Sequence, residues 1–213
     1  KILKDFSKGE LDILLGTQMI AKGLDFPNAT LVGIINADLG LHLPDFRSGE
    51  RIFQLIYQAS GRAGRRKKPG EVVIQTYVPD NPVIKNAAKL DMIKYYNIAL
   101  SERNELKYPP FSWLAKIEII GQNQTSVNSL AERIAKAVKG KYKGLDVLGP
   151  APCYLEKLRN QYRFQIVFKS LKTTDPNGQK LHKFITSNFK DFHQKFRPGK
   201  NRINIHFDPL SLI

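Results

Sequence analysis

Two arginines set among glycines form the pattern with the clearest chemistry in this sequence. The string Gln-Ala-Ser-Gly-Arg-Ala-Gly-Arg begins at Gln58 and places Arg62 and Arg65 three residues apart. Guanidinium groups stay charged and match phosphate oxygens with parallel donors, and in phosphoryl transfer they stabilise charge on the γ-phosphate. The glycines let the backbone turn sharply and approach a ligand. The pattern predicts a phosphate-binding site; the alternative is a solvated run of charge from Arg62 to Lys68.

A second stretch, Gly16 to Pro27, reads Gly-Thr-Gln-Met-Ile-Ala-Lys-Gly-Leu-Asp-Phe-Pro. It follows an apolar run, residues 11–15, that predicts a buried strand, and a short helical turn is expected over residues 19–22. Open parallel sheets bind ligands beyond the carboxyl ends of their strands, where backbone amides hold phosphates of DNA or nucleotide. In the alternative interpretation, Gly23 only closes a turn and Asp25 only bonds the following loop.

Apolar runs and helical spacing predict an α/β layer around these motifs. Residues 30–37 and 72–78 read as strands, and residues 48–59 read as a helix with Ser48 as its N-cap. Strand, crossover and strand in this order are typical of a parallel sheet. Residues 81–106 read as one long helix. Since the sheet is too small to stand alone, a truncated domain is expected.

A domain boundary is predicted where Tyr108-Pro109-Pro110 ends the long helix and forms a stiff hinge. The two predicted domains are therefore residues 1–108 and residues 109–213. Strands in the second domain are expected at residues 113–120, 147–148, 162–168 and 203–207. Helices are expected at residues 125–138 and 179–196. This β-α-β-β-α-β order indicates a split βαβ fold.

The second predicted domain carries most of the excess positive charge. The chain has 34 Lys and Arg against 19 Asp and Glu, and residues 109–213 hold 18 of the basic and 7 of the acidic residues, for a net charge of +11. A domain this basic usually meets a polyanion, because lysines and arginines that neutralise phosphates release counterions. The alternative is a soluble, lysine-rich surface.

Candidate nucleic-acid contacts in this domain come from one strand and one helix. Strand alternation puts Tyr162 and Phe164 on one face, where burial is favoured over base stacking, and leaves Arg163 on the other face as the better exposed candidate. Lys169 is expected to contact the nucleic-acid backbone too. The lysines of the last helix form either a binding face or only its solvated side: Lys180, Lys183 and Lys190.

Several classes of protein and site are excluded or disfavoured. The single cysteine, Cys153, excludes an internal disulfide and a cysteine-based zinc cluster within the chain. The four histidines show no metal-ligand spacing, and no apolar run approaches the ~20 residues that span a bilayer. A single cysteine indicates that the protein works in a reducing compartment. Because the chain begins at Lys1 rather than at a methionine, a piece of a longer protein is expected.

Together the two glycine-containing strings resemble motifs V and VI of superfamily-two helicases, and more closely the PriA family of primosomal replication-restart helicases. Further similar strings cover nearly the whole chain: Asp45 to Arg51, Pro109 to Phe111, Leu148 to Pro152 and Tyr162 to Gln165. Leu24 departs from the histidine of many relatives. The resemblance implies an α/β fold in which a truncated RecA-like helicase lobe precedes a small α+β domain of split βαβ type.

The resemblance also implies roles for single residues. Arg62 and Arg65 are expected to be arginine fingers on the γ-phosphate of ATP. The nucleotide-binding residues are expected to be Gln58, Gly61, Gly23 and Asp25, and the residues on the DNA backbone Thr17 and Gln18. Asp45, Arg47, Glu50 and Arg51 are expected to fix the helix that carries the arginines, without a catalytic role.

ATP and Mg²⁺ are the implied cofactors. The chain contains neither a G-x-x-x-x-G-K-[ST] loop nor an Asp-Glu magnesium motif, so both are expected in a preceding lobe and the chain alone is expected to be inactive. Zinc belongs to the family but to cysteines outside this chain. Implied partners are forked and single-stranded DNA, single-stranded-DNA-binding protein and primosome proteins, in the bacterial cytoplasm. The alternatives are a stand-alone DNA- or protein-binding module and a RecG-like helicase fragment.

Overall fold

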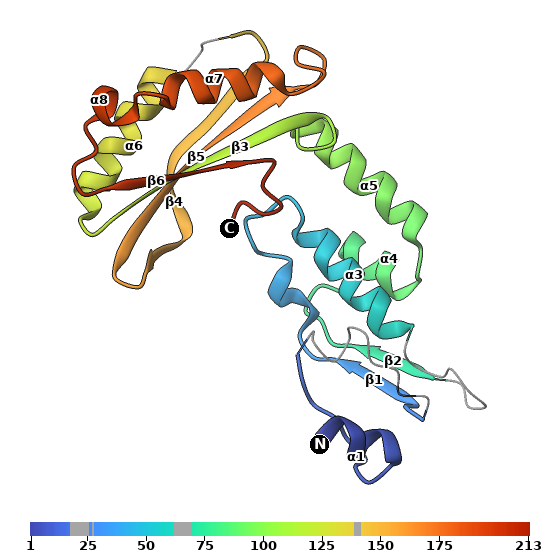
Figure 1. Ribbon diagram of the computed structural model, residues 1–213. Helices are drawn as coiled ribbons and strands as arrows, with labels where there is room; N and C mark the ends of the chain where they lie inside the picture. The colour runs from blue at the N-terminus through green and yellow to red at the C-terminus, as the bar shows by residue number, and fades with distance from the viewer. Residues whose placement is uncertain (18–25, 27, 62–69, 139–141) are drawn as a thin grey trace. The chain divides into compact units, whose positions relative to one another are not determined.

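The structure, a computed structural model, describes residues 1–17, 26, 28–61, 70–138 and 142–213. It consists of two compact units, the first formed by Lys1–Leu43 with Arg47–Ala99 and the second by Pro44–Phe46 with Leu100–Ile213. Figure 1 shows the elements of both. The division falls within helix α5 (Met92–Glu105), and the boundary predicted after Tyr108 stays a prediction.

The first unit is an α/β layer around a parallel pair of strands, β1 (Leu31–Ile34) and β2 (Glu71–Ile74), as the sequence predicts. Helix α3 (Ser48–Ser60) packs on them because its apolar side chains recur every three to four residues and form one buried face, which includes Phe53. Helix α4 (Pro82–Ala88) and α5 complete the core, where the Tyr95 ring stacks on Phe53 with centroids 4.2 Å apart. Among the described residues, the short helix α1 (Ile2–Lys8) precedes β1, and the 3-10 helix η1 (Ala37–Gly40) lies between β1 and α3.

The buried strand predicted over residues 11–15 is wrong. This segment forms neither helix nor strand, and the side chains of Ile13 and Leu15 are 84% and 81% exposed. A strand is stable only when a neighbour takes up its backbone N–H and C=O groups, and among the described residues β1 and β2 pair only with each other. Both strands are also shorter than predicted, and alternate residues along each are exposed. The predicted turn at residues 19–22 lies outside the described residues.

Each of the two long helices predicted from apolar spacing is interrupted once. Between α4 and α5, Leu90 has a positive φ of 55°, which an α-helix does not accommodate. The helix predicted over residues 179–196 is α7 (Gln179–Phe189) and α8 (Phe192–Phe196), separated at Asp191, whose φ of −107° and ψ of 41° are not helical. The apolar spacing continues across both breaks, so the pattern alone does not mark them.

The second unit is a four-stranded antiparallel sheet with helices on one face (Figure 1). In chain order its remaining elements are β3 (Ser112–Gly121), α6 (Gln124–Val138), β4 (Leu145–Leu158), β5 (Gln161–Leu171) and, after α7 and α8, β6 (Arg202–Phe207). The strands lie in the order β4-β5-β3-β6. The predicted split βαβ arrangement is confirmed, with its last helix in two parts.

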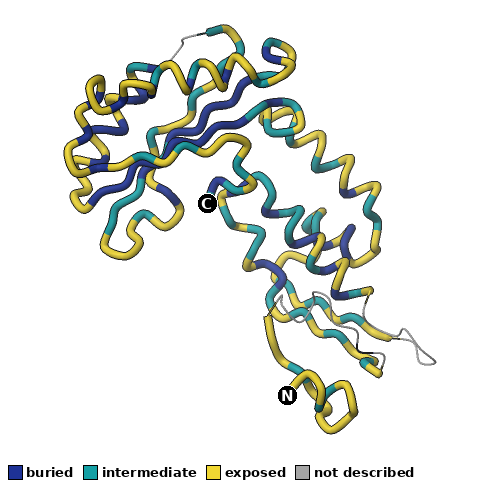
Figure 2. Tube along the Cα trace, in the orientation of Figure 1, coloured by how far each residue is buried: buried dark blue, intermediate teal, exposed yellow. Residues whose placement is uncertain are grey.

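Strand alternation builds the core of this unit. Phe164, Ile166 and Phe168 of β5 are buried in one apolar cluster with side chains of β3, α6, α7 and α8, as alternation predicts for the Phe164 face. Figure 2 shows that β3 and the second half of β5 are buried along nearly their whole length. The stacking role considered for Phe164 is therefore excluded, because only 7% of its surface is exposed.

Strand β4 is much longer than the strand predicted at residues 147–148. It continues through the cis peptide between Gly149 and Pro150, and its register against β5 shifts between Leu148 and Ala151. Gly149 has a φ of 94°, and an added Cβ would lie 2.8 Å from the carbonyl oxygen of Gln165. Glycine is therefore required at this position, and the strand continues through the Gly-Pro pair with a shift in register instead of ending there.

The first turn of α7 is capped by a carboxylate that lies three residues before the N-cap position. The N-cap residue, Gly178, has no side chain, and Asp175 takes its place. Its carboxylate accepts hydrogen bonds from the backbone N–H groups of Lys180 (3.1 Å) and Leu181 (3.0 Å) and from the Ser170 hydroxyl (3.1 Å). Burial by itself raises the pKa of Asp175, but these hydrogen bonds outweigh it, so that the pKa is lowered.

Replacing Asp175 by asparagine is expected to destabilise the second unit by about 1–2 kcal/mol at neutral pH. A carboxyl group with a lowered pKa contributes stability above its unfolded pKa, about 3.9, and loses it as the pH falls through the folded value. The difference between wild type and D175N should therefore shrink below pH ~4. Urea unfolding at several pH values measures this. A constant difference down to pH ~3 would contradict the charged cap.

Candidate functional site

The arginine motif begins at the end of α3. Gln58 lies exposed on the last turn of this helix, and Gly61 is its C-cap, with its N–H donating to the carbonyl of Tyr57 (3.1 Å). Arg62 and Arg65 lie outside the described residues. The buried side chains Ile52, Phe53 and Ile56 hold α3 in the core of the first unit. The fold thus fixes the helix and presents its end, with Gln58, to the surface of that unit.

Gly61 does not need glycine for its backbone conformation. Its φ of −68° and ψ of 0° are right-handed. Among the described residues, the atom nearest to an added Cβ would be the Tyr57 carbonyl oxygen at 3.6 Å, an ordinary contact. A positive φ is therefore not the reason for a glycine at position 61. Close approach to a ligand remains the functional reason that we predict for it.

The start of α3 also differs from its prediction. Arg47, not Ser48, is the N-cap, and the Ser48 hydroxyl donates backwards to the carbonyl oxygen of Leu43 at 2.7 Å. The Arg47 guanidinium lies 3.5 Å from the Glu50 carboxylate. These contacts support the expected role of this segment in fixing α3.

The structure describes only part of the second motif, Gly16 to Pro27. Thr17 is exposed and lies in neither helix nor strand, whereas Gln18, Gly23 and Asp25 lie outside the described residues. Phe26 is buried, and its ring packs edge-on against Phe6 with centroids 4.9 Å apart and planes at 84°. The roles predicted for this stretch stay predictions.

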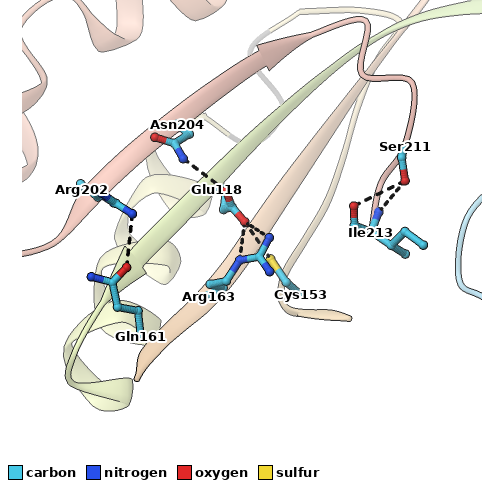
Figure 3. A network of polar contacts seen from close by, with 8 residues as sticks. All are labelled: Glu118, Cys153, Gln161, Arg163, Arg202, Asn204, Ser211 and Ile213. Atoms are coloured by element: carbon cyan, nitrogen blue, oxygen red, sulfur yellow. Dashed lines mark hydrogen bonds and ion pairs between the residues drawn. The ribbon is translucent and has the colours of Figure 1, made fainter. Parts of the chain in front are cut away.

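Arg163 is not the exposed side chain that strand alternation predicts. It crosses from β5 to Glu118 of β3, where its Nε donates to Oε1 at 2.7 Å and a terminal nitrogen lies 2.5 Å from the same oxygen. Asn204 and the Cys153 thiol also point at the carboxylate, at 3.3 Å and 3.8 Å (Figure 3). The alternation rule places Arg163 on the correct face, but that face is occupied by a buried acid that only the paired strand reveals.

The pKa values in this cluster follow its geometry. Burial raises the pKa of Glu118, but the bonded guanidinium and the Asn204 amide outweigh burial, and the net pKa is lowered. Burial and the adjacent Glu118 carboxylate raise the pKa of the Cys153 thiol to about 11. The carboxylate is therefore charged and the thiol neutral at physiological pH, which makes the cluster a structural ion pair and not a reactive site.

Lys169 is likewise buried. Only 5% of its surface is exposed, its Nζ donates to the Leu106 carbonyl at 3.0 Å, and it lies 3.7 Å from the centroid of the Tyr108 ring. Burial lowers the pKa of this amine. The expectation that Lys169 lies on an exposed nucleic-acid surface is therefore wrong, because β5 is an inner strand and its far end is covered by the segment around Tyr108.

One group of exposed cations in this unit lies on α7 and after it, in addition to those of α6, of β4 and of the turn between β4 and β5. Leu181, Ile185 and Phe189 face the core, which turns Lys180 and Lys183 outward. With these two residues, the exposed cations from α7 onward include Lys190, Lys195, Arg197, Lys200 and Arg202. We call this set the α7–α8 cationic surface. Sequence spacing identifies its first three lysines but does not establish that they are solvated.

Trp113 and its surroundings form a small hollow beside this surface. The indole N–H donates to the Asp175 carbonyl at 3.0 Å, and the Lys172 amine lies 4.2 Å from the ring. The hollow has a volume of about 240 Å³ and is lined partly by Trp113, His182 and Phe207. Trp113 is thus a half-buried side chain that a hydrogen bond to the backbone holds in place.

Neither a metal centre nor a membrane span is found in the part of the chain that the structure describes. No three His, Cys, Asp or Glu side chains gather there in a way that suits a metal ion, and no helix there has the length and apolar character to cross a bilayer.

Comparison with known proteins agrees with this division of the chain. Residues 1–67 match the family model of the helicase conserved C-terminal domain, and residues 104–210 match that of the primosomal protein N C-terminal domain. The second match covers half of the chain and nearly all of the split βαβ unit. The first covers both glycine-containing motifs, so the α/β unit is the helicase lobe, of RecA-like type.

Similar curated proteins are replication restart proteins PriA. That of Bacillus subtilis (strain 168) is 43% identical over 197 residues, 92% of this chain and 24% of the relative. That of Chlamydia pneumoniae is 38% identical over 85% of this chain and 24% of the relative, and that of Rickettsia felis is 38% identical over 99% of this chain and 31% of the relative. The chain thus spans about a quarter to a third of their length. It belongs to the PriA family of replication restart proteins, as a helicase C-terminal domain followed by the PriA C-terminal domain.

Proposed function

We propose that this chain supplies the second lobe and the C-terminal DNA-binding domain of an ATP-dependent DNA helicase that acts in replication restart and primosome assembly. The observation that carries the proposal is the arginine motif at the end of α3, within a segment that matches a helicase C-terminal domain. Arg62 and Arg65 act on the γ-phosphate as arginine fingers, because two guanidinium groups stabilise the charge that develops in phosphoryl transfer.

The nucleotide lies between this lobe and a first lobe that holds ATP and Mg²⁺. Two features support a phosphate ligand: Gln58 is exposed at the end of α3, and no atom of the described residues lies closer to the Cβ position of Gly61 than 3.6 Å. Gly23 and Asp25 contribute the ribose side of the site. The chain alone does not hydrolyse ATP. Zinc does not fit the described residues, because the one cysteine is buried beside Glu118.

The DNA surface consists of two parts. Thr17 and Gln18 contact the backbone in the helicase lobe, and the α7–α8 cationic surface contacts it in the C-terminal domain. Arg163 and Lys169 are not part of this DNA surface, since Arg163 pairs with Glu118 and Lys169 donates to the Leu106 carbonyl. The net charge of +11 in residues 109–213 supports a polyanionic ligand for the second part.

Binding of single-stranded and forked DNA at several salt concentrations tests this surface. We expect the Kd of the 213-residue chain to rise at least about tenfold between roughly 50 and 200 mM salt. The double variant Lys183→Glu, Lys190→Glu is expected to weaken binding about tenfold at ~0.1 M salt and to reduce the salt slope by about two. Fluorescence anisotropy with labelled DNA measures both.

The matched control is Lys89→Glu with Lys94→Glu, which changes the net charge equally at exposed lysines of the first unit. Its binding should stay within about twofold of wild type. An equal loss in both double variants would show that net charge alone drives binding, and no binding by a folded wild type would refute this DNA surface.

Single-stranded-DNA-binding protein and primosome proteins are the protein partners that we propose, in the bacterial cytoplasm. The observation that favours a protein ligand is the same α7–α8 cationic surface, which suits an acidic peptide as well as a phosphate backbone. Competition in the anisotropy assay separates the two. An acidic peptide that displaces DNA shares this surface, whereas one that binds without displacement uses another.

A further inference from the structure

The hollow beside Trp113 is formed by three elements of the second unit: the start of β3, the start of α7 and the end of β6 (Figure 1). Its volume of about 240 Å³ lies below the range of about 300–1,000 Å³ that is typical of sites for drug-sized ligands. The hollow therefore suits one flat ring system better than a whole nucleotide or a folded peptide.

Aromatic rings line this hollow. The His182 ring stacks on Phe207 with centroids 4.7 Å apart and planes at 30°, and both side chains are exposed, Phe207 by 40%. Trp113 is fixed by the hydrogen bond from its indole N–H to the Asp175 carbonyl. Gly178 packs against the indole, since an added Cβ would lie 3.1 Å from Cδ2 of the ring. Exposed rings of this kind serve as platforms for unpaired bases, because every base has a π-face.

The polar groups of the hollow suit the edge of a base. Asp208 lines it, and its Oδ1 accepts a hydrogen bond from the Leu114 N–H at 3.3 Å. A carboxylate also accepts hydrogen bonds from the exocyclic amino groups that cytosine, adenine and guanine carry and thymine lacks. The side-chain amides of Asn177 and Gln179 lie in the same lining, and each can both donate and accept.

The charges place a base inside the hollow and phosphates outside it. Asp208 repels a phosphate or an acidic side chain at this point. The first backbone N–H groups of α7, which could otherwise bind an anion, already donate to Asp175. The cations lie near the hollow but not in its lining: the Lys172 amine is 4.2 Å from the Trp113 ring, and Lys180 is exposed on α7.

We propose that the hollow lined by Trp113, His182 and Phe207 binds one unpaired base of single-stranded DNA, with a preference for a base that carries an exocyclic amino group. This inference rests on the proposed function, which assigns the phosphates to the α7–α8 cationic surface. The hollow adds a means of distinguishing single-stranded from double-stranded DNA, because a paired base is stacked within the duplex and cannot enter.

Trp113 is the only tryptophan of the 213-residue chain, so its fluorescence reports directly on the hollow. A single-stranded cytosine oligonucleotide of about 12 residues should quench this fluorescence at saturation. An abasic oligonucleotide of the same length and charge should quench it much less and, by fluorescence anisotropy, bind about five- to twentyfold more weakly. A thymine oligonucleotide should bind about three- to tenfold more weakly than the cytosine one. Asp208→Asn should remove this difference, because an amide can also donate to thymine O4.

Variants of the two exposed rings test the site separately from the phosphate contacts. His182→Ala and Phe207→Ala should each weaken binding of the cytosine oligonucleotide about five- to twentyfold. Their affinity for the abasic oligonucleotide should stay within about twofold of wild type, which also shows that the variants are folded. His182→Phe, which keeps a ring, should retain most of the affinity for cytosine. The matched control is Tyr154→Ala, which removes an exposed ring on β4 and should change neither affinity.

Equal affinity of the folded wild type for the cytosine and abasic oligonucleotides, without quenching of Trp113, would overturn the base site and leave the DNA surface in place. Quenching by an acidic peptide that carries an aromatic residue, and not by DNA, would assign the hollow to a protein side chain and overturn the base site as well. A folded wild type that binds neither oligonucleotide would refute the proposed DNA surface itself, and the base site with it.

Discussion

Replacing Arg62 by alanine is expected to lower the DNA-stimulated kcat for ATP hydrolysis by roughly 10²–10⁴-fold in the full-length protein that contains this chain. An arginine finger acts mainly in the transition state, where charge develops on the transferred phosphoryl group. The KM for ATP should therefore change much less than kcat. Arg62→Lys should restore little activity, because a point charge does not reproduce the planar two-donor fork of guanidinium.

The control for this prediction lies in the same run of sequence. Arg66 is the next basic residue after the motif, and Arg66→Ala removes one charge without touching the Gln58 to Arg65 string. Its kcat should stay within about threefold of wild type. Steady-state ATP hydrolysis at saturating DNA measures all three variants. Equal activities for Arg62→Ala and Arg66→Ala would mean that the arginines form only a solvated run of charge.

Replacing Arg163 by alanine is expected to lower the free energy of unfolding of the second unit by about 3–5 kcal/mol. Removing the guanidinium leaves Glu118, of which 6% is exposed, as an unpaired charge inside the sheet. If Arg163 instead contacted DNA, the same variant would weaken DNA binding and leave stability nearly unchanged. Urea unfolding, together with DNA binding at low urea, distinguishes these roles.

The pH dependence of this variant has a definite sign. In wild type the lowered pKa of Glu118 contributes stability above its unfolded pKa, about 4.3, and that contribution is lost as the pH falls through the folded value. Without Arg163, burial dominates and the pKa of Glu118 rises. The variant should therefore recover stability relative to wild type as the pH falls toward ~4.

A double replacement controls for the lost side-chain volume. Glu118→Leu with Arg163→Met removes both charges and fills the space with apolar atoms, and it should recover most of the stability lost in Arg163→Ala. If the double variant is as unstable as the single one, packing around Arg163 and not the unpaired carboxylate accounts for the loss.

Local patterns in the sequence were sufficient to predict many of the secondary-structure elements of this protein and their order. The spacing of apolar residues predicts α3, α6, the parallel pair of strands and the split βαβ order, because each pattern repeats the geometry of the element that it forms. The chemistry of the two glycine-containing strings, and the family to which they belong, are also readable from the chain. The burial of Phe164 follows from strand alternation alone.

Local patterns failed where a distant partner decides the outcome. The interruptions at Leu90 and Asp191 lie within continuous apolar spacing, and the run at residues 11–15 forms no strand because no described strand pairs with it. The spacing of apolar residues shows which face of a helix or strand is apolar. It does not record whether a neighbouring strand or a break in the helix is present.

The same distinction separates the site residues. The sequence by itself determined which side chains suit phosphate and how they are spaced: Gln58, Arg62 and Arg65. Only the tertiary structure decided that Arg163 and Lys169 are engaged inside the fold, and that Asp45 is bound by Ser211 and Leu212 at the other end of the chain. The reason is physical. A buried charged side chain points toward the partner whose interaction offsets the cost of its desolvation. Here folding brings each partner near from a position tens to more than a hundred residues away in the sequence.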